Sequence, residues 1–330
     1  MVRFKLFTIA IIIFLFYSCS LFEEDEPEAK VVYVSKSEDV LYTQNLDGTD
    51  NRRLYIKGIQ DDINSHPHIV ADSTIMNYGP LRWSPDGTKI AVVVNVAYDA
   101  SELIILTADG RKAWSASLNS QMVSGSDWSP DGTKIAYTMS TTYYGGAPEL
   151  FITDLETNTW KKITDLSTQK ARASVPRWSS DGTKIYFSIV PFPTEDTTNI
   201  GVYDIATDRV ELYTTIPWAW VGSISGDGTT FYRTGLSKGS NKGKIYSYNI
   251  TKGIAKVLSP GPNDESPRLV DNDQRILYTQ NNSVYHPPSE GGYWTFDFSV
   301  WLMDINGNNP HRLPHSEDIG SQNYVDVYWR

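Results

Sequence analysis

The sequence predicts an all-β fold, a six-bladed β-propeller of four-stranded blades, and three observations lead to this prediction. A nine-residue motif recurs along the chain at nearly constant spacing. Between its copies lie short apolar segments of strand length, separated by Asp-Gly and Asn-Gly turns. The 330-residue chain is also rich in Tyr (20), Trp (10) and Gly (23) and poor in Met (5), a composition that favours strands and turns over helices.

The repeat is most regular in the middle of the chain. Trp-Ser-Pro-Asp-Gly-Thr-Lys-Ile-Ala begins at Trp83 and recurs unchanged from Trp128, and a copy with two substitutions begins at Trp178. Degenerate copies follow with Ile224 and Leu269 at the Trp position, so the spacings are 45, 50, 46 and 45 residues. A period near 45 with several short strands per unit is typical of a propeller blade.

Each unit is read in chain order. A first strand ends at the Trp position, and Asp-Gly then makes a tight turn into a second strand such as 89–94. A third apolar strand such as 102–106 or 299–303 follows, and a further turn leads to a short fourth strand such as 311–313. Five blades therefore begin near residues 79, 124, 174, 220 and 265.

The sixth blade is predicted to be composite. The segment 31–34 starts as a second strand, followed by 39–42 and 51–54, and it lacks a first strand. The C-terminal segment 324–329 is a first strand without partners, and we expect it to end at Trp329 in the Trp position. Joining the C-terminal strand to the N-terminal blade closes the ring and covers two sheet edges.

These motifs resemble the TolB-type, WD40-like (PD40) propeller repeat, and the resemblance covers residues 31–330. TolB proteins carry an α/β domain before the propeller, and peptidases of the prolyl oligopeptidase kind carry a hydrolase domain after it. Neither is recognised here, so we expect a free-standing, monomeric propeller, and the role of TolB in the Tol system is not carried over.

The first thirty residues are predicted to be a targeting signal followed by a tether. Arg3 and Lys5 precede an apolar run of twelve residues, which is too short to span a membrane and fits a signal peptide over 1–18. Cys19 follows, and this junction resembles the lipobox of bacterial lipoproteins; the alternative is an ordinary secretory signal. An acidic tether over 19–30 leads to the propeller at 31–330. We expect a lipid-anchored protein of the bacterial outer membrane that faces the periplasm or the cell surface.

Charge and cysteine content exclude several classes of function. The formal net charge is −10, whereas a nucleic-acid-binding protein usually presents a basic face. The single Cys excludes a disulfide framework and multi-cysteine metal sites. We therefore expect the membrane to be contacted through the lipid anchor alone, and nucleic acid not to be a partner.

Binding residues are sought where the blades differ, because the repeated Trp and Asp residues are expected to be scaffold. The long insertions fall in second-to-third loops and blade-to-blade crossings, which share one face of a propeller. Aromatic side chains gather in them, and such clusters favour a glycan or a protein partner. The candidate ligand-binding residues are Tyr98, Tyr143, Tyr144, Phe192, Trp218, Trp220, Tyr285, His286, Tyr293 and Trp294.

A metal site is the alternative on the same face. His66 and His68 point the same way on an extended chain, and with His286 they could ligate a divalent cation. Oligogalacturonate lyases use metal-binding histidines on a propeller of similar repeats. We therefore expect a binding lipoprotein without a catalytic residue or a required cofactor, with a glycan, a peptide or an envelope protein as ligand. A metal-assisted polysaccharide lyase or a hydrolase is the alternative.

Overall fold

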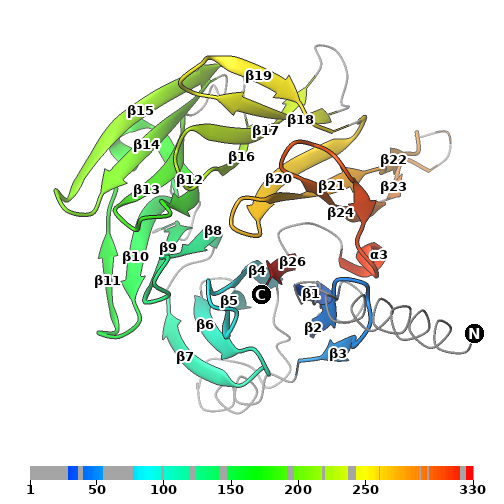
Figure 1. The fold of residues 1–330 in the computed structure, drawn as a ribbon, viewed down its shortest axis with the longest axis horizontal. Coiled ribbons are helices and arrows are strands. Elements are labelled where there is room, and N and C mark those ends of the chain that lie inside the picture. Colours follow the sequence, from blue (N-terminus) through cyan, green and yellow to red (C-terminus); the bar gives the residue numbers. More distant parts are fainter. Residues whose placement is uncertain are drawn as a thin grey trace, which may run out of the picture.

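The computed structural model confirms a six-bladed, all-β propeller (Figure 1). It describes residues 29–35, 40–54, 77–97, 100–118, 123–140, 147–191, 197–217, 220–236, 243–259, 261–287, 289, 291–295, 297–319 and 325–329. In these residues, six antiparallel four-stranded sheets stand around a central axis, with the first strand of each blade innermost.

The blades are numbered here from the composite one. Blade 1 contains β26 (Val325–Trp329), β1 (Ala29–Ser35), β2 (Val40–Asn45) and β3 (Arg52–Arg53). Blade 2 contains β4 (Asn77–Trp83), β5 (Lys89–Ala97), β6 (Ala100–Thr107) and β7 (Lys112–Ser117). Blade 3 contains β8 (Val123–Trp128), β9 (Lys134–Met139), β10 (Glu149–Asp154) and β11 (Thr159–Lys162).

The second half of the ring repeats this order. Blade 4 contains β12 (Ala171–Trp178), β13 (Lys184–Pro191), β14 (Thr197–Asp204) and β15 (Arg209–Pro217). Blade 5 contains β16 (Trp220–Ile224), β17 (Thr230–Leu236), β18 (Gly243–Asn249) and β19 (Ile254–Val257). Blade 6 contains β20 (Asp264–Val270), β21 (Arg275–Asn281), β24 (Phe298–Asp304) and β25 (His311–Arg312). A separate hairpin, β22 (Val284–Tyr285) and β23 (Trp294–Thr295), is inserted in blade 6. Two short helices, η1 (Ser167–Gln169) and α3 (Ser316–Ile319), are the helical elements of the described residues.

The ring closes as predicted, but the register of the closing strand differs from the expected one. In the regular blades the Trp position pairs with the Ile of the second strand, as Trp83 does with Ile90. In blade 1, the residue that pairs with the equivalent Val31 is Val327, whereas Trp329 pairs with Ala29. The expectation that Trp329 occupies the Trp position is therefore wrong by two residues.

The repeated turns have identical chemistry, which confirms that their Asp residues are scaffold. In the turn of blade 2, Oδ1 of Asp86 accepts hydrogen bonds from the Ser84 hydroxyl at 2.6 Å and from the Thr88 main-chain N–H at 3.0 Å. The same bonds recur at Asp131, Asp181 and Asp227. They stabilise the ionised carboxylates, and the main-chain and side-chain donors lower the pKa of Asp181 to about 2.

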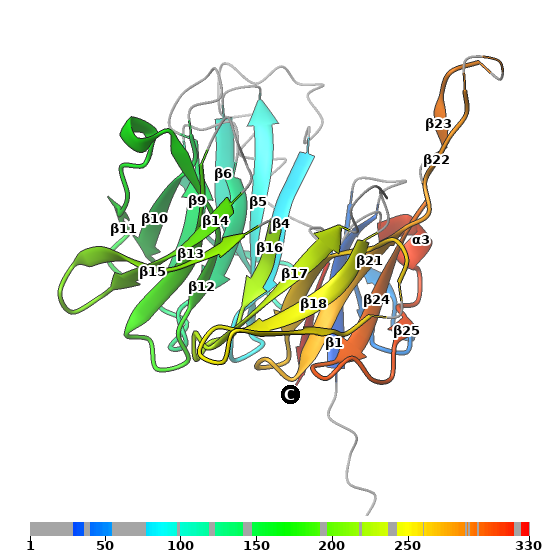
Figure 2. The same ribbon diagram turned by 90° about the horizontal axis from the view of Figure 1, so that it is seen from above.

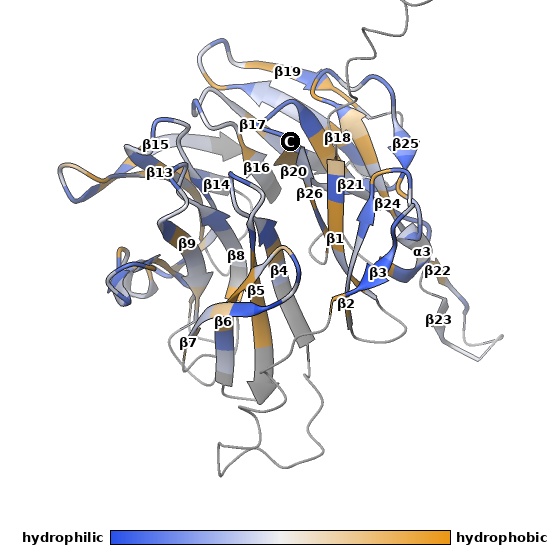
Figure 3. Cartoon of the chain, turned by 60° about the horizontal axis from the view of Figure 1, so that its bottom comes forward, coloured by the Kyte–Doolittle hydropathy of each residue, from blue (hydrophilic) through white to orange (hydrophobic). Residues whose placement is uncertain are grey.

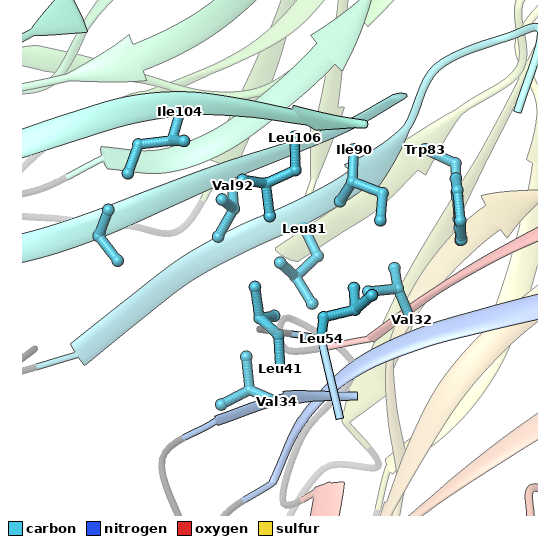
Figure 4. Packing of buried hydrophobic residues seen from close by; sticks show 11 residues of the cluster. Val32, Val34, Leu41, Leu54, Leu81, Trp83, Ile90, Val92, Ile104 and Leu106 are labelled. Atoms are coloured by element: carbon cyan, nitrogen blue, oxygen red, sulfur yellow. The ribbon is translucent and has the colours of Figure 1, made fainter. Parts of the chain in front are cut away.

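The hydrophobic core is divided into clusters between neighbouring blades. Along β5, Ile90, Val92 and Val94 pack toward blade 1, and the alternate residues Ala91 and Val93 pack toward blade 3. Figure 4 shows the first of these clusters. Two of the strands that supply it, β1 and β5, carry long hydrophobic stretches, whereas the outer strands β3 and β25 are hydrophilic (Figure 3).

The Trp side chains of the repeat close these seams between blades. Trp83 packs between blades 1 and 2, Trp128 between blades 2 and 3, and Trp178 between blades 3 and 4. Their exposed fractions are 8%, 4% and 4%. The prediction that these residues are structural is confirmed.

Candidate functional site

Most of the aromatic residues predicted for binding, and two of the three histidines, lie outside the described residues. They are Tyr98, Tyr143, Tyr144, Phe192, Trp218, His66 and His68. Trp220 begins β16, where it pairs with Thr234. Cys19, the proposed signal peptide and residues 19–28 of the tether also lie outside the described part. These predictions remain untested.

The remaining predicted residues lie together on the β22–β23 hairpin. The insertion was expected to be a loop, but it forms a two-stranded arm in which Val284 pairs with Thr295 and Tyr285 with Trp294. The arm stands clear of the disc, on the side opposite the C-terminus (Figure 2). Tyr285 is 47% exposed and Tyr293 is 53% exposed. The arm therefore presents aromatic surface that no blade covers.

His286 is held within this arm by its neighbours. Its ring stacks on Tyr293 with a centroid distance of 4.4 Å and an interplanar angle of 14°. Its Nε2 lies 2.8 Å from the Thr295 hydroxyl, and its main-chain N–H donates to the Tyr293 carbonyl at 2.8 Å. A metal at Nε2 would have to replace the Thr295 contact. In the described part of the chain, no three His, Cys, Asp or Glu residues are grouped so that they could hold a metal ion.

The opposite face of the ring carries a polar site that the sequence did not predict. A cavity of about 310 Å³, here called the channel-mouth cavity, opens between the repeated turns where the first strands converge. Its lining includes Asp326, Arg82, Asp127 and Arg177, each of which stands directly before a Trp position. In blade order from blade 1, the residues before the Trp position are Asp326, Arg82, Asp127, Arg177, Ser223 and Arg268. Hydrogen-bond acceptors and arginines thus alternate around the channel, and these six residues form a polar ring inside the propeller.

The acceptors of this ring connect one blade to the next. Asp326 accepts the main-chain N–H of Trp83 at 2.7 Å, and Asp127 accepts that of Trp178 at 2.8 Å. Ser223 accepts the N–H of Leu269 at 3.2 Å. Each acceptor therefore satisfies a backbone donor at the start of the following turn, which would otherwise be buried without a partner.

Two of the arginines form ion pairs with carboxylates of other blades. Arg268 pairs with Asp326 at 2.7 Å, and both side chains are below 10% exposed. Arg177 pairs with Asp127 at 3.2 Å and with Asp273 at 2.6 Å, and Asp273 comes from the turn after β20. Ser223 has no charge to offer Arg177, and Asp273 supplies the missing carboxylate.

Burial dominates the electrostatics of this ring. It lowers the pKa of Arg268 to about 9, with the positive charge of Arg82 acting in the same direction. It also raises the pKa of Asp127, against the opposing effect of Arg177 and Arg82. Each of the three carboxylates accepts both a guanidinium and a main-chain N–H, including Gly226 for Asp273 at 2.6 Å. The ring is therefore a structural tie between blades rather than an acid–base pair.

A signal for this ring was present in the sequence. Arg, Asp and Arg stand directly before Trp83, Trp128 and Trp178. The residue before the Trp points to the opposite face of the strand from the Trp, and hence toward the channel. Once a closed propeller is assumed, the alternation of charge predicts ion pairs between neighbouring blades at the channel, as Arg177 makes with Asp127 and Arg268 makes with Asp326.

The comparisons with known proteins agree with this architecture. A family model described as the TolB beta propeller domain matches residues 28–317. TolB from Acinetobacter baumannii is 19% identical with a TM-score of 0.59, and the match covers 96% of this chain and 69% of that one. A putative TolB from Agrobacterium tumefaciens is 14% identical with a TM-score of 0.55, over 92% of this chain and 99% of that one.

A manganese complex of an oligogalacturonate lyase is also similar, at 13% identity and a TM-score of 0.50, over 86% of this chain and 77% of that one. At such identities, these likenesses show the fold alone. A search of the curated proteins finds no match. In the part of the chain that the structure describes, no helix is long and apolar enough to cross a membrane.

Proposed function

Because this chain belongs to the TolB beta-propeller family, whose fold supports a binding or scaffold role, we propose that it is a non-catalytic protein-binding module. The partner docks on the face that carries the β22–β23 arm. The observation that supports this proposal is the exposed aromatic arm itself, which leaves the disc and packs on no core cluster of the described residues.

The register of the arm favours a protein over a glycan. Tyr285 projects from one face of the hairpin, and the next residue, His286, projects from the other, where its ring stacks on Tyr293. A partner that covers both faces has to enclose the arm, as a groove in a protein does. An isolated two-stranded hairpin is marginally stable in water, so enclosure also stabilises the arm. Tyr and Trp are the residues that most often dominate protein interfaces.

Photo-crosslinking in cells of the source organism tests this proposal. Benzoylphenylalanine replaces Tyr293 on the arm or, as the matched control, Tyr213 on the outer strand β15, which is 40% exposed. We expect a discrete protein adduct from position 293 and none from position 213. An adduct that glycosidase treatment removes would instead identify a glycan. Equal adducts from both positions, or none, would refute the proposed docking face.

The lyase alternative is tested separately through its metal. It requires His66, His68 and His286 to share a divalent cation, although His286 already contacts Thr295 and Tyr293. If the protein is a lyase, incubation with oligogalacturonate and Mn²⁺ will yield an unsaturated product that is detected by its ultraviolet absorbance. EDTA will then abolish the formation of this product. We expect no such product with or without metal.

We also propose that the propeller is held at the bacterial outer membrane by a lipid on Cys19, after removal of residues 1–18, with residues 19–28 as the tether that precedes β1. The support is the basic and apolar leader followed by the single Cys of the chain. Metabolic labelling with an alkyne fatty acid should mark the wild-type protein and not Cys19→Ser. Labelling of both proteins would exclude this anchor.

A further inference from the structure

The seam between blades 2 and 3 is open at the rim of the propeller. A cavity of about 270 Å³, here called the seam pocket, lies between β7 of blade 2 and β9, β10 and β11 of blade 3. Figure 1 shows where these strands stand in the ring. Its aromatic wall consists of Trp114, Tyr137, Phe151 and Trp160. This pocket is remote from the β22–β23 arm in the sequence and belongs to different blades.

Aromatic rings form the floor and one side of the seam pocket. Tyr137 and Phe151 stack with a centroid distance of 5.8 Å and an angle of 14°, and both are buried. Trp160 leans on Phe151 at 5.9 Å and 57°, yet 68% of its surface is exposed. Trp160 has the largest exposed fraction among the large hydrophobic residues of the described chain. An indole ring that stands beside a cavity in this way is placed to stack on a ligand.

The rim of the seam pocket is polar and electrically balanced. Asn158 and Thr159 border it from the turn before β11, and Lys162 borders it from the end of that strand. The Lys162 ammonium is paired with Asp165 at 3.0 Å, so it adds little net charge. In the described structure, neither Trp114 nor Trp160 has a hydrogen-bond partner for its indole N–H. The rim therefore offers amide, hydroxyl and N–H groups to an uncharged ligand.

We propose that the seam pocket binds a neutral pyranose ring of a glycan. A pyranose has a C–H face that stacks on an indole and an edge of hydroxyls that hydrogen-bond to amide and N–H groups, which matches the aromatic floor and the polar rim. A purely apolar ligand would leave the rim groups without partners, and a nucleotide would bring its phosphate to a chain of net charge −10. The volume lies just below the range of about 300–1,000 Å³ typical of drug-sized ligands and thus fits a single ring.

Fluorine NMR on the full chain labelled with 5-fluorotryptophan tests this site directly. The probes are the methyl pyranosides of glucose, galactose and mannose, and N-acetylglucosamine. The Trp114 and Trp160 signals are assigned from the Trp114→Phe and Trp160→Phe proteins. We expect at least one sugar to shift both signals with a common dissociation constant in the millimolar range. The Trp301 signal, from blade 6, should not move, because that ring packs on Tyr278 away from the seam.

A matched pair of variants separates the pocket from general surface effects. Trp160→Ala should weaken binding of the same sugar about tenfold, as expected for the loss of one stacked ring and its buried area. Leu212→Ala, which removes a side chain 63% exposed on the equivalent outer strand β15, should leave it unchanged. Both side chains are exposed, so both proteins should fold.

Three results would overturn the inference. The first is no change of either signal with any of the sugars, and the second is equal binding by Trp160→Ala and wild type. The third is a shift caused by the hydrophobic, anionic dye 1-anilinonaphthalene-8-sulfonate with no response to any sugar. The last would identify an apolar pocket instead. The outcome is independent of the protein-docking proposal, since loss of sugar binding at Trp160 leaves crosslinking at Tyr293 intact.

Discussion

Gly87 and Gly132 occupy the same position in turns of identical sequence, and they provide a test of how the ring is closed. Both have a positive φ, of 66° and 69°. A Cβ added at Gly87 would lie 2.2 Å from the ring of Tyr328 in the closing strand β26, whereas one added at Gly132 meets nothing within 4 Å. Tyr328 in turn packs on Trp83 at a centroid distance of 6.0 Å. The absence of a side chain at Gly87 therefore leaves the space in which Tyr328 of the closing strand packs against blade 2.

The two alanine variants should differ in stability by a calculable amount. Each introduces an alanine at positive φ, which costs about 1 kcal/mol of unfolding free energy. Only Gly87→Ala also has to displace Tyr328, and overpacking of this kind costs a further 1–3 kcal/mol or so. We therefore expect Gly87→Ala to lose about 2–4 kcal/mol and Gly132→Ala about 1 kcal/mol.

Urea unfolding followed by Trp fluorescence measures this difference, provided that the dependence on urea concentration is the same for both variants. In a Tyr328→Ala background the obstacle is absent, so Gly87→Ala should cost no more than Gly132→Ala. Equal costs for the two single variants would refute the contact. So would an undiminished cost of Gly87→Ala in the Tyr328→Ala background.

Three further predictions concern the channel, the core and the arm. Asp326→Ala should destabilise the protein by about 3–5 kcal/mol because it leaves the buried Arg268 without its carboxylate. Asp165→Ala, which breaks an exposed pair with Lys162, should cost less than about 1 kcal/mol. Similar urea midpoints for these two variants would contradict this. Burial raises the pKa of Tyr232 to about 12. Its contribution to the free energy of unfolding is therefore complete below about pH 10 and is lost as the pH rises toward 12. Tyr232→Phe should make the fall of unfolding free energy with pH shallower by about one proton, and an unchanged slope between about pH 10 and 12 would exclude the effect. Tyr285→Ser and Tyr293→Ser should each change the free energy of unfolding by no more than about 0.5 kcal/mol, since both side chains are exposed. A larger loss of unfolding free energy, measured by urea titration, would show that the arm packs on the disc.

The closing strand and the arm show where prediction from the sequence was incomplete. The sequence contains the orphan first strand 324–329, and its role in closing the ring is confirmed. Its register is not encoded locally, because Val327 and Trp329 both satisfy an apolar pattern. Pairing with Val31, which is set by the rest of blade 1, selects Val327 for the Trp position. Likewise, the aromatic insertion between β21 and β24 was located correctly, but its hairpin pairing was not foreseen.

Local chemistry determined what the sequence revealed by itself. Strand alternation and the Ser-Pro-Asp-Gly-Thr turn act within ten residues, so the repeat, the blade boundaries and the scaffold role of the Trp and Asp residues were readable from the chain. Tertiary structure alone decided which distant groups come together. Arg177 pairs with Asp273, 96 residues away, and Trp114 and Trp160 line one pocket at a seam between blades. A pleated strand specifies only which face a side chain takes. The closed ring then decides, through the spacing and tilt of its blades, which side chains from other blades face it.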